Sequence, residues 1–493
     1  MKRKLTEDVL NQIRDEYIEK AAFPKKKARI PWLRTAAAAL ALVLVTALLL
    51  PSGSNPPVVT PTAPTQSGIP QGTNTPGSNT HAVYTLSAAQ YPPHHPYPLD
   101  GNDMDAYDLW RADRKALRNH PDGYVDNLQS YFSESVPMLL NAEPGKNAVC
   151  SPLNIYMALA MLAEITDGSS RQQILDLLEA NNINTLRTQA GQVWKAHYYN
   201  DGLSTSILGS SLWLDKDYTC NQKTAELLAE AYFASVFTGD LGTEEMDQAL
   251  QGWLSKQTGG LLDDYIQNVH MDPLTTLALA STIHYQVQWT AEFWEKNNID
   301  GIFHGADNRQ NVTFMCTTLP YGPYYWSEHF GAIRLGLEDY STMWLFLPDQ
   351  GTTPEELLSS GEIFEFLYTA ENQKQQKNLM VNLQLPKFDI SGQQDLVRQM
   401  QALGVTDIFQ SGVADFSPII EEKDGGFVSE IQHAARVGID EKGVTAAAYT
   451  LILRAGAGMP PSEEMDFILD RPFVFVIESQ DGLPLFAGTV YEP

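Results

Sequence analysis

The chain has 493 residues and a formal net charge of −27, from 33 Lys and Arg against 60 Asp and Glu. Such acidity argues against nucleic acid or an anionic membrane surface as the main partner of the folded part. The length exceeds what one hydrophobic core needs, so we expect one large domain with additional segments.

The first fifty residues predict a basic stub and a membrane anchor. Residues 1–34 contain ten Lys or Arg and five Asp or Glu, and residues 30–50 are largely apolar. The apolar stretch reaches the ~20 residues that span a bilayer. Because the KKKAR cluster precedes it, the positive-inside rule predicts a cytoplasmic stub (1–29), an N-terminal helix held in the membrane, and a single-pass cell-membrane protein whose folded domain is extracellular. A cleaved signal peptide is the alternative, although the basic region is long for one and no clear cleavage site follows.

Residues 51–104 predict a tether rich in Pro, Thr and Ser. No Asp, Glu, Lys or Arg occurs from Thr35 to Leu99, and this composition is typical of an extended, uncharged linker. The adjacent His94 and His95 could bind a metal, but no spaced partner accompanies them, so solvated linker histidines are the favoured interpretation. The folded domain is then expected over residues 105–493.

The three cysteines do not predict a disulfide framework or a zinc site. Cys150, Cys220 and Cys316 are sparse, odd in number and far apart, and no CxxC motif is present. We expect three small buried hydrophobic residues, with one disulfide as the alternative, and we expect no cofactor.

Hydrophobic periodicity after residue 105 predicts helices early and long strands late. Apolar residues recur at helical spacing in 125–140 and 154–165. Strands are expected at 276–289, 342–349 and 379–388, and a hairpin around an Asp-Gly turn is expected within 473–493. This order predicts an α+β fold with N-terminal helices and large antiparallel sheets.

One segment fits two conformations. Residues 440–461 read DEKGVTAAAYTLILRAGAGMPP. The uncharged middle could pair as a strand, whereas the end is small and rich in turn formers and suits an exposed loop.

Several stretches resemble the serpin family, in the same order along the chain. They are NAVCSPLNIYMALAMLAEITDG (147–168), HYQVQWTAEFW (284–294), LPKFDISGQQDLVRQMQALGVTDIF (385–409), ADFSPI (414–419), VSEIQHAARVGIDEKGVTAAAYT (428–450), DRPFVFVI (470–477) and PLFAGTV (484–490). The resemblance implies the serpin fold and an exposed reactive-centre loop that serves as bait for a serine protease and inserts into the main sheet after cleavage.

The resemblance also implies the mechanism, which is suicide inhibition through a covalent acyl-enzyme complex, without a catalytic residue of the inhibitor's own. Counted from Gly443 as in the family, the reactive bond is Ala457–Gly458. A small residue there suits elastase-like or subtilisin-like proteases. The alternative bond, Arg454–Ala455, would suit a trypsin-like protease but would shorten the inserted strand.

Two sets of residues are assigned by the resemblance. The loop hinge is Glu441, Gly443, Val444, Ala446, Ala447 and Ala448, and the sheet-opening region is Ser151, Asn154, Ser281, Trp289 and His433. Glycine adapts to the hinge and small alanines pass between strands, where a charge would be buried at a cost. The pattern departs from the family at Val444, where Thr or Ser is usual, and at Tyr449, which ends the alanine run early.

The sheet-opening region departs from the family twice. Asn154 occupies a position where Ser is commoner, and Ser281 replaces an Asn that would bond the histidine, which puts that bond in doubt. Without the resemblance, His433 and Trp289 would be interpreted as ordinary core residues.

Three other functions are compatible with parts of the sequence. A non-inhibitory serpin-fold binding or structural module would usually carry a hinge spoiled by charge, Pro or bulky residues, and none precedes Tyr449. A hydrolase would show a GxSxG, HExxH or P-loop motif, and none is present. A transmembrane sensor would use the basic stub, which carries no identifiable signalling motif.

Overall fold

The computed structural model describes residues 83–98, 100, 103–121, 123–306, 308–369, 372–422, 426–428, 431–444 and 463–493. All of them belong to one compact unit, Pro61–Pro493. The predicted stub and anchor, most of the predicted tether and the loop from 445 to 462 lie outside the described residues.

The predicted location in the cell membrane is contradicted by the structure. Among the helices of the described residues, none combines the length and the apolar character needed to cross a bilayer. The single-pass arrangement with an extracellular domain is therefore wrong as a prediction, and the apolar run 30–50 on which it rested lies outside the described residues.

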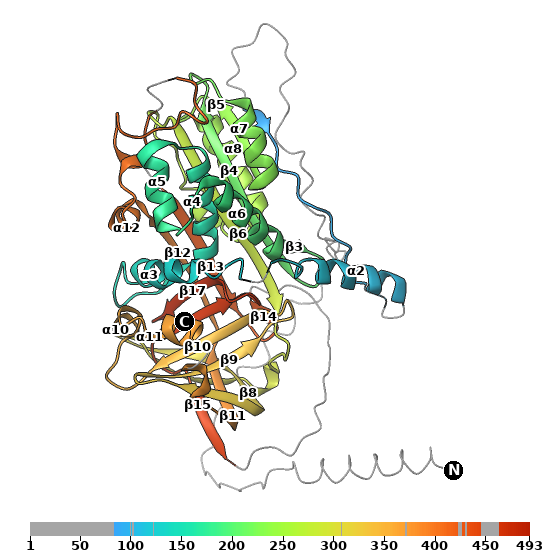
Figure 1. The fold of residues 1–493 in the computed structure, drawn as a ribbon. Coiled ribbons are helices and arrows are strands. Elements are labelled where there is room, and N and C mark those ends of the chain that lie inside the picture. The colour runs from blue at the N-terminus through green and yellow to red at the C-terminus, as the bar shows by residue number, and fades with distance from the viewer. Residues whose placement is uncertain are drawn as a thin grey trace, which may run out of the picture. The chain divides into compact units, whose positions relative to one another are not determined.

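The first of two sheets has eight strands and holds the candidate site (Figure 1). Its order is β1 (Tyr84–Ser87), β5 (Ala234–Gly239), β4 (Thr205–Asp215), β6 (Leu277–Gln288), β14 (Gly443–Val444), β13 (Gln432–Ile439) and β12 (Phe388–Asp395), with β3 (Tyr199–Asn200) also paired to β4. Neighbouring strands are antiparallel except β4 and β5, which are parallel. The short β14 is thus the link between β6 and β13.

The second sheet has nine strands, and its buried side chains belong to the same main core as those of the first sheet. Its order is β15 (Glu464–Ile468), β11 (Gln376–Pro386), β8 (Arg309–Trp326), β9 (Phe330–Gly336), β10 (Thr342–Pro348), β16 (Phe473–Glu478), β17 (Pro484–Val490) and β2 (Ala148–Cys150), with β7 (Ile299–His304) paired to β8. Only β11 and β15 pair in parallel. The predicted strands and the C-terminal hairpin are confirmed as β6, β10, β11 and β16–β17.

Helices cover both faces of the eight-stranded sheet, and a further helix packs on the nine-stranded sheet, where Phe366 contacts Phe330 and Trp344. They are α2 (Met104–Ala116), α3 (Leu128–Leu140), α4 (Pro152–Glu164), α5 (Gly168–Leu177), α6 (Ile183–His197), α7 (Gln222–Ala231), α8 (Glu244–Thr258), α9 (Asp263–Ile266), α10 (Pro354–Ser359), α11 (Glu362–Tyr368) and α12 (Val397–Ala402). The predicted early helices are confirmed as α3 and α4.

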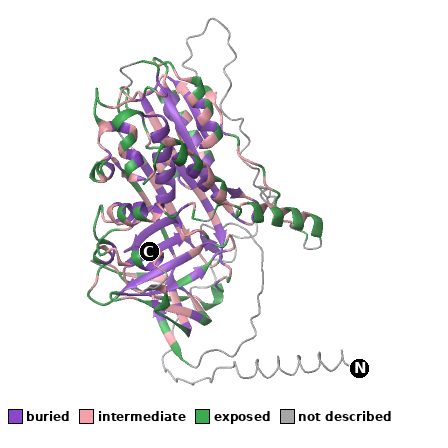
Figure 2. Ribbon diagram, in the orientation of Figure 1, coloured by how far each residue is buried: buried purple, intermediate pink, exposed green. Residues whose placement is uncertain are grey.

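Helix α4 lies in the main core and α8 on the opposite face. Ser151 caps α4 and Pro152 occupies its first turn, and because the helix is apolar all round it is almost wholly buried (Figure 2). Met246 and Leu250 of α8 pack in a separate cluster with Ala280 of β6. Side chains of β6 therefore alternate between the two faces, as the period of a strand requires.

The described part of the predicted tether packs against the domain. Strand β1 pairs with the edge strand β5, and the ring of Tyr91 lies 5.2 Å from the rings of both Trp194 and Tyr198. The two adjacent histidines also contact the domain. The His94 ring packs on Tyr198, and the His95 ring hydrogen-bonds the carboxylate of Asp113 at 2.9 Å. Residues 83–98 thus form an outer strap rather than a free linker.

The three cysteines are free thiols. Cys150 is buried as expected, and burial raises the pKa of its thiol. Cys220 and Cys316 are only partly buried, so the prediction of three buried hydrophobic residues is wrong for these two. None is joined in a disulfide.

Candidate functional site

A tight turn begins the candidate loop. After β13 ends at Ile439, Asp440 N–H donates to the carbonyl of Gly443 at 3.1 Å. The Asp440 carboxylate accepts from the backbone N–H groups of Lys442 and Gly443 at 2.8 and 3.2 Å. An aspartate that caps its own turn in this way is a strong turn former. The chain therefore reverses direction at once and enters β14.

Strand β14 lies between β6 and β13. Gly443 pairs with Gln288, and Val444 pairs with Val287 on one side and with Ile439 on the other. Val444 is buried, with 1% of its surface exposed. In the described part of the sheet, β6 and β13 do not pair with each other, and only these two residues of β14 join them. The sheet thus already holds the first two residues of an additional strand.

Gly443 is required here by close packing. A Cβ at this position would lie 2.2 Å from the carbonyl oxygen of Val287 and 2.7 Å from Cα of Gln288. Its φ is not in the left-handed region, so steric contact rather than backbone freedom explains glycine in this state.

We expect Gly443→Ala to destabilise the folded chain by about 1–3 kcal/mol, since β14 or the end of β6 must shift to admit a methyl group. Urea unfolding of the two proteins measures the difference. The control is Gly252→Ala, because no atom lies within 4 Å of the position that a Cβ would take there. Gly202→Ala would not serve, because the φ of Gly202 is +84°. Equal stabilities of Gly443→Ala and Gly252→Ala would contradict the steric explanation.

Trp289 holds the turn from the end of β6. Its indole N–H donates to the carbonyl of Asp440 at 2.8 Å, and its backbone N–H donates to the carbonyl of Lys442 at 2.8 Å. Phe293 adds a third bond, from its N–H to the carbonyl of Glu441 at 2.9 Å. Trp289 is therefore more than a core residue, because it fixes the point where the loop leaves the sheet.

Glu441 fastens the same turn on its other side. Its carboxylate accepts from Nζ of Lys387 at 2.5 Å and from the amide of Asn298. Burial tends to raise the pKa of Glu441, but the hydrogen bonds from Lys387 and Asn298 outweigh it and hold the pKa below its usual range. The carboxylate therefore stays charged and its anchoring bonds stay intact at neutral pH.

The four other predicted residues of the sheet-opening region meet beneath the sheet. The backbone N–H of Ser151 donates to Nε2 of His433 at 3.1 Å. The hydroxyl of Ser281 donates to Oδ1 of Asn154 at 2.5 Å, and the Ser151 hydroxyl caps α4 by accepting from Asn154 N–H at 3.4 Å. Ser151, Asn154 and His433 are buried and Ser281 is half-buried. This cluster joins α4 to β6 and β13, the two strands that flank β14.

Comparisons with known proteins agree with this geometry. The family model described as "Serpin (serine protease inhibitor)" matches residues 131–493. The chain belongs to the serpin family. Pig plasminogen activator inhibitor 1 is 27% identical over 397 residues, which cover 76% of this chain and 94% of that protein. Serpins are in general inhibitors of serine proteases and not catalysts.

Two solved structures share the fold of this serpin. Native tengpin, a thermophilic serpin, superposes with a TM-score of 0.67 at 24% identity, over 76% of this chain and 95% of its own. Human thyroxine-binding globulin complexed with thyroxine superposes with a TM-score of 0.65 at 21% identity, over 75% of this chain and 100% of its own. At these identities the likeness shows the fold alone.

The two departures from the serpin pattern compensate each other. Asn154 stands where Ser is commoner and Ser281 where Asn is commoner, and these two side chains hydrogen-bond each other directly. The doubt about a bond from position 281 to the histidine is justified, because within the described residues Ser281 bonds Asn154 and His433 bonds Ser151. The serpin cluster has exchanged an amide and a hydroxyl between two facing positions.

We expect the exchange to be visible as non-additivity. Asn154→Ser should cost roughly 1–2 kcal/mol, because it leaves the Ser281 hydroxyl without its acceptor. Ser281→Asn should cost a similar amount by overpacking a filled cluster. The double variant should be more stable than the sum of the two losses predicts by at least ~1 kcal/mol. Urea unfolding of the four proteins measures this, and strict additivity would contradict direct coupling.

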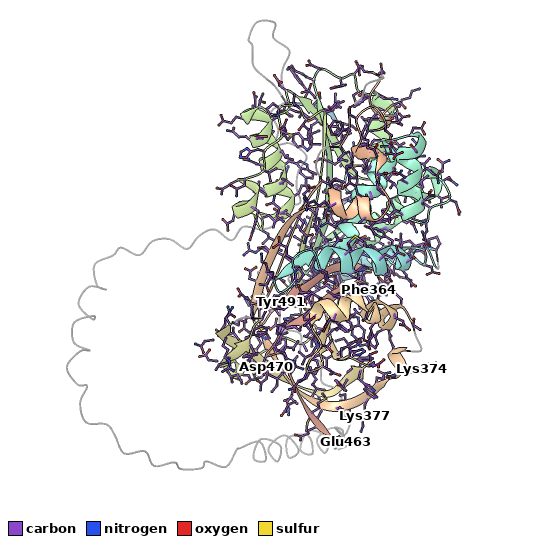
Figure 3. All side chains as sticks on the ribbon, turned by 90° about the vertical axis from the view of Figure 1, so that its left-hand side faces the viewer. Phe364, Lys374, Lys377, Glu463, Asp470 and Tyr491 are labelled. Carbon is purple, nitrogen blue, oxygen red and sulfur yellow. The ribbon has the colours of Figure 1, made fainter. Side chains whose placement is uncertain are left out.

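The loop itself lies beyond the described residues. Of the predicted hinge, the structure places Glu441, Gly443 and Val444 together, whereas Ala446, Ala447 and Ala448 and both candidate bonds, Ala457–Gly458 and Arg454–Ala455, fall within 445–462. The chain resumes at Glu463, which pairs with Lys377 at the edge of the nine-stranded sheet (Figure 3). The loop therefore starts from one sheet and returns to the other.

Three anchoring residues were not predicted. Asp440, Lys387 and Asn298 hold the turn, but only Asp440 carried a local signal, as an aspartate that opens a turn before glycine. Lys387 and Asn298 are 54 and 143 residues away from Glu441 in sequence, so their contact depends on the fold. The residues assigned to the sheet-opening region rest on the resemblance, and that role stays a prediction.

Proposed function

We propose that this serpin inhibits a serine protease as a suicide substrate, by cleavage and insertion of the segment that follows Val444. The observation that carries the proposal is β14, which enters between β6 and β13 and pairs with both. An additional strand is already started at the only point where these strands are joined in the described sheet.

The chemistry follows from the reaction of a serine protease with a bound loop. The protease serine Oγ attacks the carbonyl carbon of the bait residue, an ester forms, and the amide bond breaks to release the amine of the next residue. Continued insertion from β14 would carry the esterified protease away from its docking position. Distortion of its oxyanion hole costs roughly 10²–10³ in rate per lost donor, so water does not complete the hydrolysis.

The bait bond is proposed at Ala457–Gly458, fourteen residues beyond Gly443 by the family spacing. A methyl side chain fits the small pocket of an elastase-like protease or the tolerant one of a subtilisin-like protease. Arg454–Ala455 is the alternative for a trypsin-like protease, and it would leave three fewer residues to insert.

The test is incubation of the full chain with subtilisin, pancreatic elastase and trypsin, followed by a denaturing gel and sequencing of the released peptide. The proposal predicts a covalent band near the summed masses and a peptide that begins at Gly458. A protease whose serine is replaced by Ala serves as the control, because it binds without forming an ester. A peptide that begins at Ala455 would assign the bait to Arg454.

Clean cleavage by all three proteases without a covalent band would favour the non-inhibitory alternative, a serpin-fold binding or structural module. Among the structural relatives, thyroxine-binding globulin is a serpin fold solved with a hormone bound. Thermal unfolding of the cleaved chain separates the two functions further, because a module whose loop does not insert gains no heat stability on cleavage.

A further inference from the structure

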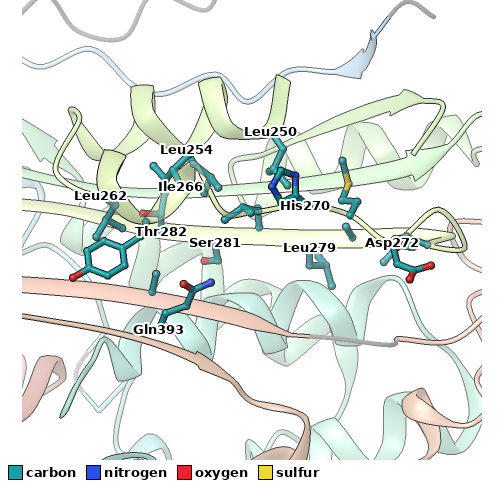
Figure 4. Close-up of a pocket in the computed structure, with 18 residues that line it drawn as sticks. Leu250, Leu254, Leu262, Ile266, His270, Asp272, Leu279, Ser281, Thr282 and Gln393 are labelled. Carbon is teal, nitrogen blue, oxygen red and sulfur yellow. The ribbon is translucent and has the colours of Figure 1, made fainter. Parts of the chain in front are cut away.

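A cavity of about 120 Å³ lies against β6 beneath α8 and α9 (Figure 4). On one side it is lined by large apolar side chains, among them Leu250, Leu254 and Ile266. On the sheet side the lining includes the small residues Ala278, Ala280 and Ala434, beside the larger Leu277, Leu279 and Gln393. Its volume is close to that of apolar cavities that accept a benzene ring. The cavity therefore has room for at least one large apolar side chain that reaches it from the sheet.

The register of β14 determines which loop residues would reach this cavity. Gly443 pairs with Gln288 and Val444 with Val287, so each further residue of an antiparallel strand would face the residue one position earlier on β6. Tyr449, five positions beyond Val444, would then face Thr282, five positions before Val287. The pairing of Val444 with Ile439 places Tyr449 opposite Ala434 on β13 by the same count.

Alternation along the strand directs the large side chains toward the cavity. Val444 belongs to the main core, so residues at even positions would face that core and residues at odd positions would face α8. Tyr449, Leu451 and Leu453 are all at odd positions. Their partners on β6 are Thr282, Ala280 and Ala278, and each of these lines the cavity.

The other face of an inserted strand would carry small residues at positions 446, 448 and 450. Ala446 would face Tyr285 and Ala448 would face Ile283, both of which are buried in the main core. Thr450 would face Ser281 and His433, the polar cluster. Up to position 450, the residues directed to the filled core are thus small, whereas Ile452 would face Leu279 at the margin of that core. A shift of register by one residue would reverse both matches.

We infer that this cavity is the receiving site for Tyr449, Leu451 and Leu453 once the loop inserts; the inference rests on the proposed function. Tyr449, which departs from the family by ending the alanine run, then stabilises the inserted strand instead of obstructing it. The occupant of the cavity is this chain's own segment 449–453.

A disulfide trap tests the register directly. In the full chain, Tyr449→Cys is combined with Ala434→Cys, its expected partner, or with Ala435→Cys, whose side chain points to the other face. Directly opposite residues lie within disulfide range, whereas side chains on opposite faces do not. The loop is cut beyond residue 453 with trypsin or subtilisin, the cut is located by mass spectrometry, and mild oxidation follows. The single-cysteine variants control for Cys220 and Cys316.

We expect a 449–434 disulfide in the cleaved chain only, and no 449–435 disulfide. We also expect cleaved Tyr449→Ala to unfold about 5 °C below cleaved Tyr449→Phe, because a ring is lost from the cavity. A 449–435 disulfide, or equal midpoints for the Ala and Phe variants in a cleaved chain that has gained heat stability, would overturn the inference and leave insertion standing. No gain of heat stability on cleavage would overturn the proposed function itself.

Discussion

Ala448→Glu is expected to convert this serpin from an inhibitor into a substrate, whereas Ala447→Glu is expected to leave most of the inhibition intact. If the register of β14 continued into an inserted strand, residue 448 would face Ile283 and Ala435, which are 7% and 2% exposed in the main core. A carboxylate there would have to lose its hydration without a partner, at a cost of several kcal/mol. Insertion would slow, and hydrolysis of the acyl-enzyme would overtake it.

Residue 447 provides the matched control because it faces the other side of the sheet. Its expected partners are His284 and Arg436, which are only half-buried, and the Arg436 guanidinium bonds Asp389 at 2.8 and 2.6 Å. A glutamate at 447 would therefore lie beside a cation and near solvent. Because both variants add the same charge, a difference between them reports which side of the sheet the side chain faces.

The measurement is the yield of covalent complex for each mole of cleaved inhibitor, read from a denaturing gel with the protease that the wild type inhibits. A slowing of insertion by about 1.4 kcal/mol at the transition state lowers the ratio of covalent complex to hydrolysed, cleaved inhibitor on this gel roughly tenfold. We expect at least that loss for Ala448→Glu and less than about twofold for Ala447→Glu. Equal losses in both variants would contradict the register on which the prediction rests.

Much of the fold could be predicted from the sequence because its signals are local. The apolar period of 154–165 and the Ser-Pro start before it are sufficient for a buried, capped helix, which the structure shows as α4. The long apolar runs and the Asp-Gly turn are sufficient for β6, β10 and the C-terminal hairpin. Each of these elements depends on residues that are close together in sequence.

Only some members of the candidate site were predicted, and their contacts were not. The resemblance identified Asn154 and Ser281 as two separate departures, and the hydrogen bond between them joins residues 127 positions apart. The strap 83–98 was interpreted as a linker because its composition lacks charge, whereas stacking of Tyr91 on Trp194 is a tertiary contact. The apolar run 30–50 was interpreted from its hydropathy and from the basic cluster before it, and the resulting localisation was wrong.

The packing of the loop side chains against the cavity beneath α8 could not be predicted from the sequence, because it depends on the register of β14. The sequence from 446 to 453 reads AAAYTLIL, and the sizes of these side chains have no meaning for packing until one pair is fixed. The pairing of Val444 with Val287 fixes it. Extended from that pair, an antiparallel register would give each residue of the inserted loop a face and a partner, and the proposed cavity would receive Tyr449.

Folding stability of this serpin is expected to fall as the pH drops from 6.5 to 4, through protonation of His433. Burial, the sole cause of the shift, lowers the pKa of this histidine from 6.5 to about 4. Its Nε2 accepts the N–H of Ser151, so the neutral ring carries its proton on Nδ1. The folded state therefore favours the neutral imidazole. The contribution of neutral His433 to folding stability is fully present above pH 6.5.

The sign follows from proton linkage. Between the two pKa values the unfolded chain binds a proton that the folded chain excludes, so stability decreases as the pH falls. The loss reaches about 2 kcal/mol at pH 5 and about 3 kcal/mol below pH 4. The same protonation replaces the acceptor of the Ser151 N–H by a donor, which weakens the contact between α4 and β13.

The measurement is urea unfolding at pH 7.5 and pH 5.0 for the wild type and for His433→Gln, whose amide oxygen can still accept the Ser151 N–H but does not titrate. Carboxylates elsewhere contribute equally to both proteins, so the difference isolates the histidine. We expect the wild type to lose about 2 kcal/mol more than His433→Gln between these pH values. Parallel losses in the two proteins would show that His433 keeps an ordinary pKa in the fold and does not couple the sheet-opening region to pH.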